Sequence, residues 1–154
     1  MDFRGRTDLA RGYRNNNPLN IRYSAGNPWE GKISYFRNTD EKKQYEQFDS
    51  MEYGYRAAFV LMRNKISQGY DTVEKLIGVW APPTENNTNG YIARVCATAL
   101  LDPSDRINRN DRDTLTKMAY AMSIVENDSN KYKAANHAAG LPNMDIINAG
   151  WELI

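Results

Sequence analysis

The chain has 154 residues, of which 25% are charged and 41% hydrophobic, and its formal net charge is +1. This length suits one domain that buries roughly 70% of the surface its unfolded form exposes, so we expect no cofactor or metal to be needed. A charge so near neutral predicts no nucleic-acid partner, and without a long apolar run or an apolar leader we expect no membrane span and no signal peptide.

Residues 1–12 lack a periodic pattern, and we expect them to form an N-terminal arm ahead of a single domain over residues 13–154. The Asn-rich run at 11–21 predicts a tight loop that leads into a strand. Two aromatic-rich segments, 32–36 and 44–48, flank a polar stretch. This spacing predicts a small β-hairpin.

The remainder of the chain has the apolar spacing of helices. A helix end is indicated by the two prolines at 82–83 and by the Asp-Pro pair at 102–103. We therefore predict a predominantly helical α+β domain with one hairpin. The residues expected to cap the four main helices are Asp49 with Glu52, Asp71 with Glu74, Thr88, and Asn110 with Asp113.

The predicted helix from 110 to 127 carries an acid on its apolar face. At about 100° per residue, Leu115, Met118, Ala119, Met122 and Glu126 share one side. A carboxyl placed there is shielded from water, which raises its pKa and suits a general acid. The alternative is a frayed last turn whose carboxylate reaches solvent, because four polar residues follow at once.

The reactive side chains present in the sequence limit the kinds of catalytic site that the chain can form. His137 is the sole histidine, so a zinc site built from two or three imidazoles is excluded. Cys96 is the sole cysteine and lies in an apolar helical pattern, which favours an inert core residue over a Cys96/His137 peptidase. No glycine-rich phosphate loop is present. Carboxylate chemistry remains.

Glycoside cleavage needs an acid that protonates the leaving oxygen, and usually a second carboxylate. Glu126 is the best acid. For the second role we consider Glu46, Asp49 and Glu85, but spacing along the sequence does not show which of them faces Glu126.

Two polar clusters, at 14–20 and 80–88, suit a ligand with many hydroxyls and amides. Aromatic faces nearby can stack on sugar rings. The alternatives are that the asparagines stabilise turns and that Trp80, on its helix's apolar stripe, belongs to the core. The candidate binding residues are Arg14, Asn15, Asn16, Asn17, Asn20, Trp29, Trp80, Asn86, Asn87 and Tyr91.

Four motifs stand out in chain order: RGYRNNNPLNI at 11–21, Trp29-Glu30-Gly31, Phe48 ahead of Gly54-Tyr55-Arg56-Ala57, and WAPPTENNT at 80–88 with Tyr91-Ile92. Together they resemble a family of bacteriophage and prophage proteins, described as virion structural proteins or lysins and related to the murein-degrading lysin of an enveloped phage. The resemblance covers roughly residues 11–127. It implies a lysozyme-like domain that acts on peptidoglycan, at either the glycan or the peptide cross-link.

A second similarity is to lytic transglycosylases of the lysozyme superfamily, which combine a helix-end Glu, a Gly-Leu-Met-Gln segment and an Ala-Tyr-Asn loop in that order. Segment 17–21 resembles the second part and segment 80–88 the third, while Glu126 would supply the first from the opposite end of the chain. This similarity implies a circularly permuted arrangement. Where related sequences often read Glu-Asn-Gly, this one reads Glu126-Asn127-Asp128, so the turn after the acid differs.

Our leading hypothesis is a phage-derived enzyme that cleaves the glycan between N-acetylmuramic acid and N-acetylglucosamine, as a muramidase or lytic transglycosylase. The rivals are a non-catalytic virion structural or wall-binding module and a peptidoglycan endopeptidase. We expect peptidoglycan as partner, together with other virion proteins. We also expect the chain to reside in the virion, or in the host cytoplasm before release, and to act at the cell wall.

Overall fold

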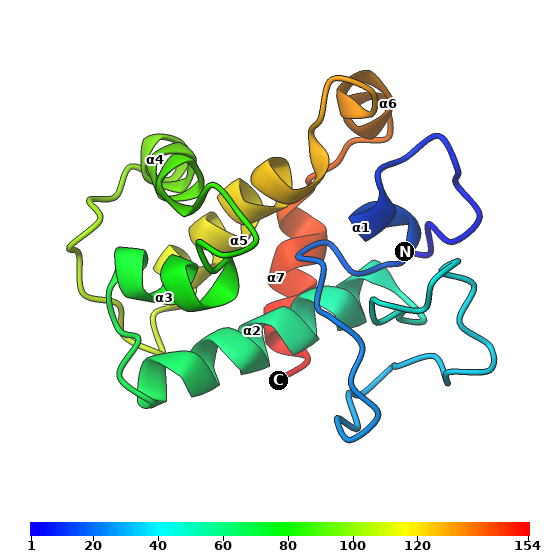
Figure 1. Cartoon of the computed structure of the whole chain (residues 1–154), viewed down its shortest axis with the longest axis horizontal. Coiled ribbons are helices and arrows are strands. Elements are labelled where there is room, and N and C mark those ends of the chain that lie inside the picture. Colours follow the sequence, from blue (N-terminus) through cyan, green and yellow to red (C-terminus); the bar gives the residue numbers. More distant parts are fainter.

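The computed structural model describes residues 1–154 and consists of helices joined by loops (Figure 1). The long helix α2 packs against α7, which also contacts α5, while α4 packs between α3 and α5. No helix is both long enough and apolar enough to cross a membrane. The helices are α1 (Arg11–Arg14), α2 (Met51–Ser67), α3 (Val73–Trp80), α4 (Thr88–Ala99), α5 (Arg112–Asn127), α6 (Lys133–Ala138) and α7 (Met144–Glu152).

The four main helices begin within two residues of the predicted positions, but each cap is the neighbour of the residue expected. At each start two adjacent side chains can accept a hydrogen bond from the first turn, and local sequence does not choose between them. Glu52, expected to complete a capping box, instead binds the N-terminal ammonium group at 2.7 Å. The observed caps are Ser50, Thr72, Asn87 and Asp111.

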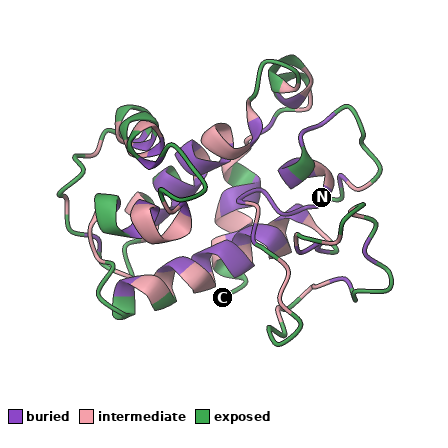
Figure 2. Ribbon diagram, viewed as in Figure 1, coloured by how far each residue is buried: buried purple, intermediate pink, exposed green.

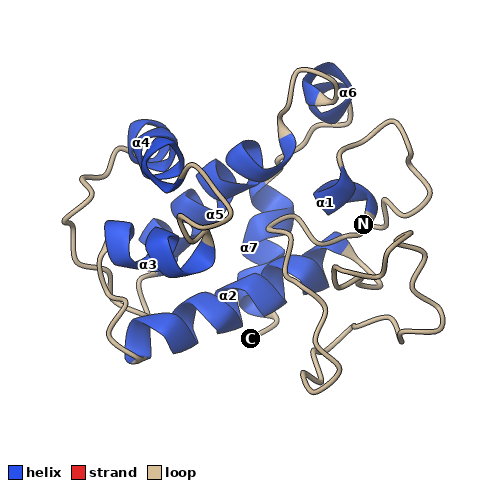
Figure 3. Cartoon of the chain, viewed as in Figure 1, coloured by secondary structure: helices blue, strands red, loops and turns tan.

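The expected α+β fold, a lysozyme-like domain with a small β-hairpin, is wrong, because the structure is helical and contains no strand (Figure 3). The two aromatic segments meet at one isolated bridge, between Lys32 and Phe48, and at the Ile33 N–H that donates to the Gln47 carbonyl at 2.8 Å. Elsewhere, side-chain amides form hydrogen bonds with the backbone groups that a strand would use. For example, the Asn38 side chain donates to the Tyr45 carbonyl at 3.0 Å. Such bonds compete with a strand ladder.

The backbone of residues 44–48 pairs instead with the loop that precedes the aromatic segments. Glu46 N–H donates to the Ile21 carbonyl at 2.9 Å, and Phe48 N–H to the Asn15 carbonyl at 3.1 Å. These bonds tie the segment to residues 15–21, here called the asparagine loop. The loop is therefore held in place from one side by residues far along the chain.

The core lies where the apolar faces of α2, α5 and α7 meet, and most other residues of these three helices are partly buried (Figure 2). Residues 1–10 also contribute, since Phe3 and Leu9 are buried. The Phe3 N–H donates to the Asn16 side chain at 2.9 Å. The start of the chain thus packs beneath the asparagine loop.

Candidate functional site

Glu126 lies in the last turn of α5, as predicted, and the helix ends at Asn127. Leu115, Met118 and Met122 on the same face are fully buried, which confirms the apolar stripe. The Glu126 residue itself is partly buried. Its carboxyl group is therefore at the edge of the core and does not point into bulk solvent.

Each of the two carboxyl oxygens of Glu126 accepts one hydrogen bond from another side chain. The Asn20 side-chain amide donates to Oε1 at 2.9 Å, and the Tyr91 hydroxyl donates to Oε2 at 2.9 Å. Asn20 comes from the asparagine loop and Tyr91 from the first turn of α4. The first polar cluster, at 14–20, thus reaches the acid through Asn20, and Tyr91, which follows the second cluster at 80–88, reaches it from α4.

Asn20 reaches Glu126 because the asparagine loop is anchored to the end of α5. The Asn127 side-chain amide donates to the Pro18 carbonyl at 2.8 Å. Asn20 has φ +53°, a left-handed conformation that asparagine tolerates better than most residues. Gly12 leaves room for this contact, since a Cβ there would lie 2.3 Å from the Asn127 side-chain oxygen.

The surroundings of Glu126 raise its pKa above the usual value for a carboxyl group. Burial is the largest cause, because it penalises the charged form. The hydrogen bonds from Asn20 and Tyr91 and the positive charge of Arg11 act in the opposite direction but do not cancel the effect of burial. A carboxyl in this state can hold a proton closer to neutral pH than an exposed one, as a general acid must.

Glu126 lines a pocket of about 120 Å³, here called the acid pocket, with Asn20, Trp80 and Glu85 among its walls. A second pocket of about 280 Å³ adjoins it, sharing Asn20 and Trp80 and adding Trp29; we call it the tryptophan pocket. The acid thus sits beside an aromatic surface.

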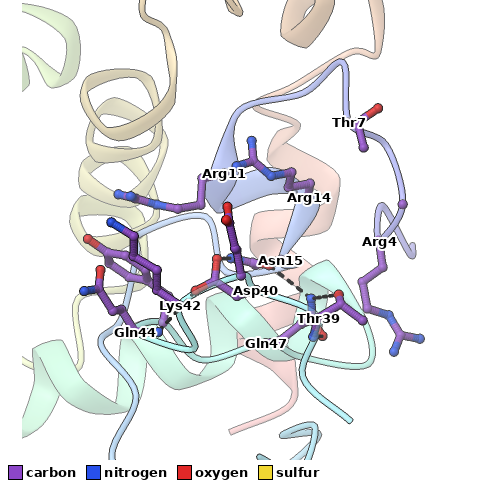
Figure 4. A pocket seen from close by; sticks show the side chains of 13 residues that line it. Arg4, Thr7, Arg11, Arg14, Asn15, Thr39, Asp40, Lys42, Gln44 and Gln47 are labelled. Carbon is purple, nitrogen blue, oxygen red and sulfur yellow. Dashed lines mark hydrogen bonds between the residues drawn. The ribbon is translucent and has the colours of Figure 1, made fainter.

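A third pocket, of about 800 Å³ (Figure 4), adjoins the acid pocket. The two pockets share Arg11 and Tyr45. Because four of its side chains are arginine or lysine, we call it the cationic pocket. The acid pocket thus shares wall residues with each of the other two pockets, and we call the three pockets together the groove.

The predicted binding residues separate into two groups. Those that line the groove or contact Glu126 are Arg14, Asn15, Asn20, Trp29, Trp80, Asn86 and Tyr91. Trp80, which could have belonged wholly to the core, is only partly buried and lines two of the pockets.

The other predicted binding residues use their amides inside the protein. Asn16 bonds Phe3 N–H and the Phe48 carbonyl. Asn17 bonds both backbone groups of Ile21, and Asn87 caps α4. For these asparagines the structure shows turn and cap bonds and no place on the groove surface.

Of the three candidates for a second carboxylate, Asp49 is exposed and lines none of the three pockets, and the other two have different surroundings. Glu46 is fully buried, pairs with Lys32 at 3.0 Å, and lines none of the three pockets. Burial raises its pKa, against the lowering effect of Lys32. Glu85 does line the acid pocket, but its side chain is 52% exposed and pairs with Arg22 at 3.0 Å.

We expect Lys32→Met to lower the free energy of unfolding by about 3 kcal/mol at pH 7, because it leaves Glu46 buried without its counter-ion. A buried acid with a raised pKa destabilises the fold once it is charged, so this loss should shrink as the pH falls through the raised pKa. Denaturant unfolding at pH 7 and pH 4 measures it, with the exposed Lys75→Met as control. If the variant were less stable by the same amount at both pH values, the loss would come only from the hydrogen bonds that Lys32 donates to the Ser24 and Asn27 carbonyls.

Three groove residues, Arg11, Arg22 and Tyr45, were not predicted from the sequence. The Arg11 guanidinium stacks 3.9 Å from the centre of the Tyr45 ring and acts on the charge of Glu126. The one sequence feature that could have pointed to Arg11 is its position at the start of the RGYRNNNPLNI motif. Arg22 and Tyr45 meet at an isolated bridge, which no local pattern marks.

Cys96 and His137 do not form a common site. His137 lines a separate pocket and bonds Asp128 at 2.8 Å, and Cys96 is not among the residues of that pocket. Burial raises the pKa of the Cys96 thiol, which disfavours the reactive thiolate. The arrangement offers no support for a cysteine peptidase.

No family model matches the chain. It is 34% identical over 128 residues to Protein P5 of Pseudoalteromonas phage PM2, a match that covers 81% of this chain and 76% of that protein. The chain is accordingly phage-related, in keeping with the bacteriophage motifs of its sequence. On this identity and coverage, it belongs to the family of Protein P5 of phage PM2.

Proposed function

We propose that this chain cleaves the glycan strand of peptidoglycan between N-acetylmuramic acid and N-acetylglucosamine. The observation that carries the proposal is the Glu126 carboxyl, partly buried at the centre of a groove, with a raised pKa. A carboxyl that keeps its proton near neutral pH can protonate the oxygen between two sugars. The choice of peptidoglycan over other glycans rests on the sequence motifs, which resemble those of phage lysins.

In the proposed reaction Glu126 transfers its proton to the bridging oxygen while the bond from that oxygen to muramic acid C1 breaks. Water, or the 6-hydroxyl of the same muramic acid, then bonds to C1 and returns its proton to the Glu126 carboxylate. Water leaves a reducing end, as in a muramidase, and the 6-hydroxyl leaves an anhydro end, as in a lytic transglycosylase. Neither path needs a nucleophilic carboxylate.

The absence of a second free carboxylate in the acid pocket fits these paths. Glu85 is the one other acid on its walls, and Arg22 neutralises it. Trp29 and Trp80 would stack on sugar rings in the tryptophan pocket, where an aromatic face binds the apolar side of a ring. The substrate would thus place sugar rings in the tryptophan pocket and the bond to be cleaved beside Glu126.

One observation favours a second candidate, a non-catalytic virion or wall-binding module. Each Glu126 oxygen already has a protein donor, as a carboxylate with a purely structural role would. In that case the groove would hold glycan without cutting it. Both candidates are compatible with a virion-associated protein that works at the cell wall beside other virion proteins.

Digestion of purified murein sacculi, followed by mass spectrometry of the soluble products, tests the proposal. New reducing or anhydro-muramic ends support glycan cleavage and also decide between water and the 6-hydroxyl. New amino groups would instead identify an endopeptidase. Sedimentation with the sacculi and no released product would leave the binding module.

We expect Tyr91→Phe to raise the pKa of Glu126 further, because the hydroxyl bond stabilises the charged carboxylate. The alkaline limb of the pH profile for product release should therefore move to higher pH. At pH 7 the free energy of unfolding should fall by about 1–2 kcal/mol, since a buried oxygen loses its partner. The exposed Tyr70→Phe is the matched control, and an unmoved alkaline limb would count against Glu126 as the acid.

A further inference from the structure

The cationic pocket is the largest hollow of the groove, and the proposed cleavage does not use it. Its volume of about 800 Å³ lies within the range of ligand sites in proteins. Arg14 and Lys42 line it, and Arg11 stands on the border that it shares with the acid pocket (Figure 4). A group bound here would lie beside whatever Glu126 contacts.

These three cations have no ion-pair partner in the protein. Arg14 donates to the Leu9 carbonyl at 3.1 Å, which leaves its charge uncompensated. Arg11 lies over the Tyr45 ring, and Lys42 is exposed. By contrast Arg4, at the far rim, is paired with Asp2 at 2.9 Å.

Two acids, Asp40 and Glu41, line the same pocket and are also free of ion pairs. Asp40 accepts only from neutral donors, the Asn15 amide at 3.5 Å and the Gln44 N–H at 3.2 Å. Positive and negative side chains therefore share the pocket without neutralising each other. This mixture disfavours a polyanion such as nucleic acid and suits a ligand that carries both carboxylates and an ammonium group.

We propose that the cationic pocket binds the peptide stem of peptidoglycan, with Arg11, Arg14 and Lys42 facing its carboxylates and Asp40 and Glu41 facing its amino group. The stem is attached to the muramic acid, so it must lie next to the sugar that Glu126 would act on. The proposal rests on the proposed function for the identity of the polymer. It makes the peptide-bearing glycan, and not the bare glycan, the preferred substrate.

Arg11 would connect the two pockets. Its charge lowers the pKa of Glu126, against the larger effect of burial. A carboxylate of the stem beside Arg11 would offset that charge and so favour the protonated acid. Peptide-bearing substrate would then shift the alkaline limb of the pH profile upward relative to bare glycan.

Binding tests this without depending on cleavage. The Glu126→Gln chain is titrated into a fluorescent disaccharide–tetrapeptide, into the same compound with its carboxylates converted to amides, and into the peptide-free disaccharide. Anisotropy should show roughly tenfold tighter binding of the intact compound than of the other two, a gain that falls as salt is added. The double variant Arg14→Gln/Lys42→Gln should abolish that gain.

The matched control is Lys75→Gln/Lys117→Gln, which removes two exposed charges outside the groove and should leave all three affinities unchanged. Equal binding of the intact and amidated compounds, or none of either, would overturn the proposal. So would a single-stranded oligonucleotide that binds the pocket more tightly than the intact compound. If the wild-type chain releases no product from sacculi, the proposed cleavage fails while the binding comparison still decides the pocket's ligand.

Discussion

Glu126→Gln should reduce product release from murein sacculi by about 10²- to 10⁴-fold, the usual effect of removing a general acid. The amide has nearly the same shape but carries no acidic proton. It can also keep both hydrogen bonds: its oxygen accepts from Asn20, and its NH₂ group donates to the Tyr91 oxygen. The loss of activity would therefore come from chemistry and not from a damaged fold.

The stability of Glu126→Gln should have a distinctive pH dependence. Because burial raises the pKa of Glu126, the charged carboxylate costs stability above that raised pKa, and the cost disappears below the ordinary carboxyl pKa. The variant should thus be as stable as the wild type at low pH and equally or more stable at pH 7. Thermal unfolding at both pH values measures this. A variant that is less stable only at pH 7 would mean that the charged carboxylate stabilises the fold.

Two other carboxyl variants sharpen the comparison. Glu74→Gln removes an exposed carboxyl on α3, outside the acid pocket, and should release product at the wild-type rate. Glu85→Gln removes the ion-pair partner of Arg22 at the pocket wall. This variant should lose far less of its product-release activity than Glu126→Gln does. An equal loss in the two acid-pocket variants would instead give the site a second catalytic carboxylate.

Gly54→Ala should lower the free energy of unfolding by about 3 kcal/mol or more. A Cβ on Gly54 would lie 1.9 Å from the Asn16 carbonyl oxygen and 2.9 Å from Pro18 Cδ. The Asn16 carbonyl is backbone of the asparagine loop, which hydrogen bonds hold from several sides, so it cannot move aside cheaply. Any movement would also carry Asn20 away from Glu126.

Gly78→Ala is the matched control, because Gly78 also lies within a helix but has no atom within 4 Å of the position its Cβ would take. That substitution should raise the free energy of unfolding by about 0.5–1 kcal/mol, since alanine loses less backbone freedom on folding. Denaturant unfolding of the two variants gives the comparison directly. If Gly54→Ala proved as stable as Gly78→Ala, the asparagine loop would not pack on α2 as described.

The β-hairpin and the exact helix caps were predicted wrongly because both depend on contacts beyond the local sequence. Aromatic residues at 32–36 and 44–48 have strand propensity, but the neighbouring amides, such as that of Asn38, bond the backbone and remove the ladder. At the helix starts, adjacent residues such as Asp49 and Ser50 have equal capping ability, and the choice depends on what else is near. Glu52, for instance, is drawn to the N-terminal ammonium group.

By itself the amino-acid sequence determined that a helix ends near residue 127 with an acid on its apolar face, because helix periodicity and helix ends are local properties. Only the tertiary structure decided which groups hold that acid, since Asn20 is 106 residues away and Tyr91 is 35. The same holds for the separation of Glu46 from the groove and for the three pockets around Glu126. Such contacts arise from the packing of α4, α5 and the asparagine loop against one another, and spacing along the chain does not encode them.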